Sequence, residues 1–157
     1  MSLPYRNNKK KRTNSYILIG DGFDEFEVVY FLHKFRQAGL PIKSVSLFDK
    51  LVYSRQGVGL KADFSLADKP FDQADEYWLI LPSGGRNGDV LRRDVRVKSL
   101  LESVSLGNGQ VVVTDNDSDL AEDVDRLFTE RPSLHPHFDE PLESFVDTLT
   151  DRVVYAS

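Results

Sequence analysis

Short apolar runs alternate with amphipathic stretches along the first two thirds of the chain. An apolar run bounded by turn residues is typical of a buried strand. The runs lie at residues 15–20, 41–48, 77–81 and 111–113. Strands and helices that alternate in this way form a mostly parallel sheet with helices on both faces. The sequence therefore predicts an α/β fold.

The first helix is predicted between residues 21 and 39. One face carries Val28, Phe31, Leu32 and Phe35 at helical spacing, and Gly39 is placed to end the helix. On the other side, the helix carries three further aromatic residues, so we expect it to be well buried. These residues are Phe23, Phe26 and Tyr30.

A second helix is predicted over residues 94–105. Its apolar set is Val95, Leu100, Leu101 and Val104.

The remaining segments give weaker patterns. Residues 51–66 indicate two short strands around a turn at Gln56 and Gly57, and residues 83–88 indicate a glycine-rich loop. Residues 119–128 are compatible with a short helix, and the proline-rich stretch 130–141 with a loop or an edge. The segments SFVDT and RVVYAS suggest a terminal hairpin, with its turn near Thr150 and Asp151.

Three loops are predicted to meet at one edge of the sheet. In open α/β sheets, ligands bind at the carboxyl ends of the strands. The loops at residues 20–24, 81–89 and 115–119 follow such strands. We therefore expect any functional site among these residues.

Composition narrows the function classes. The chain has 157 residues, a net charge of −5 and no cysteine. The acidic balance argues against nucleic acid as a partner, and the lack of cysteine excludes disulfides and thiolate catalysis. No apolar run approaches a membrane span and no signal peptide is visible, so we expect no membrane contact and a cytoplasmic location. Residues 1–14 are polar and basic and are interpreted as a solvated extension rather than a nucleic-acid arm.

Several segments, in this order, resemble the ThiJ/PfpI superfamily, whose domains are related to class I glutamine amidotransferases. They are GDGFDEFEVV, QAGLPIKSVSL, GVGLKADFSL, LPSGGRNGDVLR and GNGQVVVTD. The resemblance covers residues 15–157 as one domain. It implies a flavodoxin-like three-layer sandwich. The family continues into a final helix beyond a segment like RVVYAS, so we expect that helix to be absent here.

The resemblance also implies a three-part site. A cysteine lies on a strand-to-helix elbow, a glutamate from the first helix lies beneath it, and backbone amides of a glycine loop form an oxyanion hole. The glutamate corresponds to Glu27 and the glycine loop to Gly84 and Gly85, with Ser83 as an extra residue in that loop.

The cysteine has no counterpart in this chain. The elbow falls at Asn116 or Asp115, and Asp117 stands where the family often has a histidine. Neither Asn116 nor Asp115 replaces a thiolate in amide or aldehyde chemistry. We therefore assign no catalytic residue, and Glu27 stands as the retained acid of the family.

These residues favour a non-catalytic domain that acts in small-molecule sensing, dimerisation or regulation. The ligand-binding residues are expected to be Glu27, Gly84, Gly85, Asp115, Asn116 and Asp117. A neutral or cationic small molecule, and a second copy or a fused domain, are the expected partners. No cofactor is expected.

Two alternatives stay open. In the first, the chain is an enzyme of the amidase, peptidase or glyoxalase type that uses Glu27 and Asp115 as acid–base groups. In the second, it is a structural domain whose site has collapsed.

Two arrangements of possible metal ligands are present, and neither is expected to bind a metal ion. His135 and His137 stand two apart in a proline-rich loop beside carboxylates. Asp115, Asp117 and Asp119 alternate as in a calcium loop, but the glycine and glutamate that such a loop needs do not follow. We expect no metal site.

Overall fold

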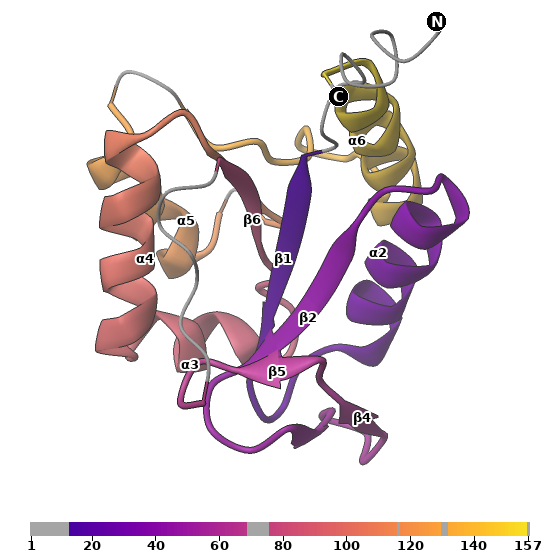
Figure 1. The fold of residues 1–157 in the computed structure, drawn as a ribbon, viewed down its shortest axis with the longest axis vertical. Coiled ribbons are helices and arrows are strands. Elements are labelled where there is room, and N and C mark those ends of the chain that lie inside the picture. The colour runs from indigo at the N-terminus through magenta and orange to yellow at the C-terminus, as the bar shows by residue number, and fades with distance from the viewer. Residues whose placement is uncertain (1–12, 69–75, 116, 130–131, 157) are drawn as a thin grey trace, which may run out of the picture.

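A parallel sheet forms the centre of the fold (Figure 1). The computed structural model describes residues 13–68, 76–115, 117–129 and 132–156. Within them, five strands pair in the order β5-β2-β1-β6-β7, and every pairing is parallel. The strands are β1 (Asn14–Ile19), β2 (Ile42–Ser46), β5 (Phe64–Ser65), β6 (Tyr77–Leu81) and β7 (Gln110–Val113).

The strands are buried on both sides because helices cover both faces of the sheet. One face carries α2 (Glu25–Gln37) and α6 (Leu142–Ala156), and the other carries α4 (Val95–Leu106) and α5 (Asp119–Leu127) (Figure 1). The short helix α3 (Asn87–Arg92) lies on the second side. The predicted mostly parallel sheet between two helical layers is confirmed.

Helix α2 begins where the sequence provides a cap. The Asp24 carboxylate accepts hydrogen bonds from the backbone N–H groups of Phe26 and Glu27, at 3.0 and 3.3 Å. The helix ends before Gly39, whose φ of 75° suits glycine, as predicted. However, Phe26 is 53% exposed, so the prediction that the helix is well buried through its second set of aromatic residues is wrong for Phe26. Phe26 lies about 200° around the helix from the buried Val28 and therefore faces away from the sheet.

The predicted pair of short strands is confirmed. β3 (Leu51–Tyr53) and β4 (Gly59–Lys61) pair antiparallel around a turn in which Gly57 has a φ of 86°. Two backbone hydrogen bonds attach this hairpin to the loop after β1. Gly22 N–H donates to the Tyr53 carbonyl at 2.8 Å, and Arg55 N–H donates to the Phe23 carbonyl at 2.9 Å.

The second predicted helix exists, but its apolar set differs. Val95, the first residue of α4, is 76% exposed, and Val97 takes its place in the core. Val95 lies about 200° around the helix from Val97 and therefore faces solvent when Val97 packs on the sheet. Helix α3, directly after the glycine loop, was not predicted.

The predicted terminal hairpin is wrong. Residues Leu142–Ala156 form helix α6, which packs beside α2 through Phe145, Val146, Leu149 and Val153. Apolar residues three or four apart decide this outcome, because they form one stripe on a helix. The expectation that the chain lacks a closing helix on the sheet is therefore also wrong.

Leu149→Ala tests the packing of α6. Leu149 is 2% exposed and lies in the core between α6 and the sheet. Its truncation should lower the free energy of unfolding by about 3 kcal/mol in urea denaturation. The matched change Thr148→Ala, at an exposed site in the same helix, should alter it by no more than about 0.5 kcal/mol. Equal small effects of the two changes would contradict a buried α6 stripe.

Candidate functional site

The candidate site lies where the chain changes direction across the sheet. After β1 the chain adds β2 and β5 on one side, and β6 and β7 then extend the other side. The carboxyl ends of β1 and β6 therefore mark the topological switch point, the usual ligand position in open α/β sheets. The loops after β1 and β6 meet there, as predicted from the sequence.

Asn87 joins the ends of these two strands. Its side chain is fully buried. The side-chain oxygen accepts the Gly20 N–H at 2.6 Å, and the side-chain nitrogen donates to the carbonyls of Leu18 and Pro82, at 3.1 and 2.7 Å. The sequence placed Asn87 in the glycine loop without indicating this role. Its position next to several glycines is a weak signal.

Gly85 is required where the two loops touch. Its φ is 60°, and a Cβ atom at this position would lie 2.2 Å from the Gly22 carbonyl oxygen. The neighbouring Arg86 N–H donates to that same carbonyl at 2.8 Å. The glycine therefore serves a close backbone contact.

The structure brings Glu27 and Gly84 together. The Gly84 N–H donates to Glu27 Oε1 at 3.0 Å. A Cβ on Gly84 would lie 2.9 Å from Asp24 Cβ and 3.0 Å from Glu27 Oε1. The amide expected to serve as an oxyanion donor is thus hydrogen-bonded to the protein's own carboxylate.

Burial raises the pKa of the Glu27 carboxyl above its ordinary value of 4.5. Hydrogen bonds from Gly84 and Thr114 act in the opposite direction, and the negative charges of Asp24 and Asp115 add to the rise. The net direction is upward, so the site disfavours the ionised form of Glu27.

Thr114 is a site residue that the sequence did not reveal. It is nearly buried at the end of β7, and its Oγ1 accepts the Ser83 N–H at 2.9 Å and lies 3.0 Å from Ser83 Oγ. Thr114 is also among the groups that lower the pKa of Glu27. The available signal was its place as the last residue of the VVVT run, directly before the predicted elbow.

The residues of the elbow that the structure describes are exposed to solvent. Asp115 and Asp117 are both exposed, and the Asp117 N–H donates to Asp115 Oδ1 at 2.9 Å. Asn116, the other candidate for the nucleophile position, lies outside the described residues. The Asp115 carboxylate is close enough to Glu27 to affect its pKa.

One cation approaches this acidic site. The Arg55 guanidinium, from the turn of the β3–β4 hairpin, forms an ion pair of 3.1 Å with the Asp24 carboxylate. A Cβ on Gly85 would lie 3.3 Å from Arg55 Cδ, so the arginine borders the glycine loop. The sequence placed Arg86 in the glycine loop but did not indicate that Arg55 reaches this site.

The metal patterns bring no set of ligands together. Across the residues that the structure describes, no three His, Asp or Glu side chains form a group that could hold a metal ion. The Glu140 carboxylate instead accepts the backbone N–H of His137 at 3.0 Å, and Asp119 pairs with Arg92 at 3.6 Å.

None of the described helices is long and apolar enough to cross a membrane.

Glu27→Gln tests the environment of the carboxyl. Glutamine keeps an oxygen for the Gly84 N–H but carries no charge. Because the folded-state pKa is raised, the stability contributed by neutral Glu27 is complete at low pH and is lost as the pH rises through that pKa. The wild type should therefore lose stability relative to Glu27→Gln as the pH rises from the ordinary carboxyl value of 4.5 toward neutrality, measured by urea unfolding. If the two stability profiles run parallel, or if the wild type becomes more stable relative to the variant as the pH rises, burial does not raise the pKa of Glu27.

Solved structures share this fold at low sequence identity. A DJ-1 superfamily protein of Salmonella typhimurium, determined as a cysteine-to-alanine mutant, superposes with a TM-score of 0.71 at 16% identity, over 91% of each chain. DJ-1 of Schizosaccharomyces pombe gives 0.68 at 19% identity, over 92% of this chain and 98% of the other. DJ-1beta of Drosophila melanogaster gives 0.71 at 15% identity, over 91% of each.

The family is established by sequence. No curated protein matches the chain significantly. Residues 14–114, which run from β1 to the end of the elbow strand, match the DJ-1/PfpI family. This match spans well over half of the chain and includes Glu27, the glycine loop and Thr114. The chain therefore belongs to the DJ-1/PfpI family.

Proposed function

We propose that this chain is a non-catalytic DJ-1/PfpI domain that acts by binding, as a sensor or regulatory module. One observation carries the proposal: the Gly84 N–H is used by Glu27 within the protein. The chain contains no cysteine, so Glu27 has no thiol with which to share a proton. Glu27 and the glycine loop thus stabilise each other instead of activating a nucleophile.

The residues around Glu27 define the ligand chemistry of this proposal. Of the acids Asp24, Glu27 and Asp115, Asp24 is paired with Arg55, and the negative charge of Asp115 favours a neutral or cationic small molecule. Gly85 and Arg86 at the loop surface are exposed, so a ligand would contact the glycine loop from the solvent side. A cytoplasmic location suits this role and is part of the proposal.

An acid–base enzyme is the second candidate, and the raised pKa of Glu27 favours it. A carboxyl whose pKa is raised holds its proton more readily and is therefore better suited to general acid catalysis than an ordinary one. In this case Glu27 donates the proton and Asp115, exposed at the elbow, acts as the base.

Activity assays separate the two candidates. The purified chain should not accelerate the conversion of small aldehydes, primary amides or peptides above the buffer rate. Since enzymes speed reactions by about 10⁶-fold or more, even weak catalysis would be detected. Turnover that Glu27→Gln or Asp115→Asn abolishes, and that Asp139→Asn at a distant exposed site preserves, would establish the enzyme instead.

We also propose that the chain dimerises through the exposed face of α2. Phe26, Val29 and Val58 are 53%, 49% and 48% exposed and border one apolar cavity between α2 and the hairpin. Apolar side chains gathered in this way mark interaction surfaces. In the same cavity, Glu25 Oε2 is buried without a hydrogen-bond donor among the described residues.

A second copy of the chain fits this face by charge. The first turn of α2 carries Glu25 beside this cavity. The last turn carries Lys34 and Arg36, which pair within the chain with Asp147 at 3.3 Å and with Asp63 at 3.4 Å. A twofold axis across α2 would pair the two helices antiparallel, so that each acidic end meets a basic end. The same pairing would bring a cation toward the buried Glu25 oxygen.

Val29→Glu tests the dimer. The change places a charge at the centre of the apolar face and should convert a dimer to a monomer in light scattering after size exclusion. Leu106→Glu is the matched control, because Leu106 is 90% exposed at the end of α4. If the wild type is monomeric at high concentration, or if both variants remain dimeric, this surface is not the interface.

A further inference from the structure

A groove lies between α3, α4 and α5, on the face of the sheet opposite to α2. Its volume is about 320 Å³, at the lower end of the range for ligand sites. Its walls are apolar and come from all three helices. The apolar lining residues are Leu91, Val97, Leu101, Leu120 and Leu127.

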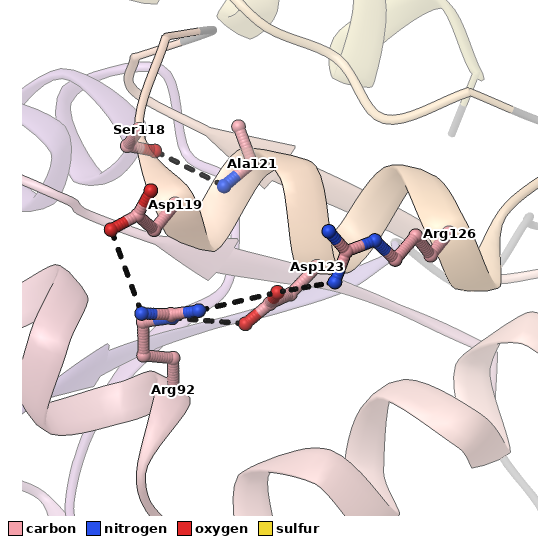
Figure 2. Close-up of polar contacts among 6 residues, drawn as sticks. All are labelled: Arg92, Ser118, Asp119, Ala121, Asp123 and Arg126. Carbon is pink, nitrogen blue, oxygen red and sulfur yellow. Dashed lines mark hydrogen bonds and ion pairs between the residues drawn. The ribbon is translucent and has the colours of Figure 1, made fainter.

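The polar residues of this groove are mainly cations. Arg92, Lys98 and Arg126 line it, together with a single acid, Asp123. Figure 2 shows how that acid is used: Arg92 donates to it at 3.0 Å, and Arg126 lies 3.5 Å away on the other side. Arg92 is held further by Asp119 at 3.6 Å.

Two of these cations are available to a ligand. The Lys98 ammonium group makes no ion pair with another described residue, and Arg126 is 74% exposed, with one long contact to Asp123. They stand on α4 and α5, so the groove has a cation from each of two helices. This local positive charge contrasts with the net charge of −5 of the whole chain.

We propose that this groove binds a small amphipathic carboxylate. The hydrocarbon body packs on the leucine and valine walls, and the carboxylate pairs with Lys98 and Arg126. A single negative charge suits the site better than a dianion, because Asp123 remains among the lining residues. The volume limits the body to about the size of a medium-chain fatty acid.

The groove is connected to the elbow through α5. Ser118 caps this helix by accepting the Ala121 N–H at 3.1 Å (Figure 2). Leu120, in the first turn, lines the groove. A ligand in the groove therefore contacts the helix that starts at the elbow. The inference stands independently of the proposals for Glu27 and for the dimer.

Binding of decanoate below its micelle concentration tests the proposal. Backbone amide shifts of the ¹⁵N-labelled chain should change in α3, α4 and α5. Decanoate should bind at least about tenfold more tightly than decylamine, which has the same body and the opposite charge. The double variant Lys98→Ala/Arg126→Ala should lose about tenfold in decanoate affinity. The control Lys43→Ala/Arg152→Ala removes two exposed cations from β2 and α6 and should bind as the wild type does.

Three results would overturn this assignment: equal or tighter binding of decylamine, shifts confined to other parts of the chain, or unchanged affinity in the Lys98→Ala/Arg126→Ala variant. Circular dichroism of each variant verifies that it is folded. Catalytic and dimer assays are not involved, so failure here leaves the other proposals untouched.

Discussion

The direct backbone contact between the loops after β1 and β6 is the constraint on which the site depends. Gly85 lies so close to the Gly22 carbonyl that no side chain fits between them. Asn87 fixes the same two loops from beneath with three buried hydrogen bonds. Because these contacts set the position of Gly84, its N–H points at Glu27 rather than at solvent. The β3–β4 hairpin, bound to the first loop at Gly22 and Phe23, then places Arg55 at the rim.

The parallel sheet and its helices could be predicted because their signals are local. A buried parallel strand is an uninterrupted apolar run, and α2 has a cap, an apolar stripe and a stop glycine in the expected order. The prediction for the C-terminal segment was wrong for a physical reason. Short runs such as SFVDT and RVVYAS suit a strand as well as a helix, and only their common stripe, buried against α2, favours α6.

The candidate site was predictable only in part. The family resemblance singled out Glu27 and Gly84, and the structure shows them hydrogen-bonded to each other. Asn87 and Thr114 were not foreseen, because their roles depend on contacts 67 and 31 residues away in the chain. Arg55 was missed for the same reason, since it reaches the site through the hairpin. Such contacts have no periodic signature in a sequence.

The proposed role depends above all on Glu27 accepting the Gly84 N–H within the free protein. An NMR titration that follows the Gly84 amide and the Glu27 carboxyl carbon together, with hydrogen exchange of the amide, measures this contact. We expect a protected Gly84 amide whose chemical shift follows the ionisation of Glu27. A Gly84 amide that exchanges freely and does not respond to Glu27 would contradict the contact, and the glycine loop would then be open to a substrate.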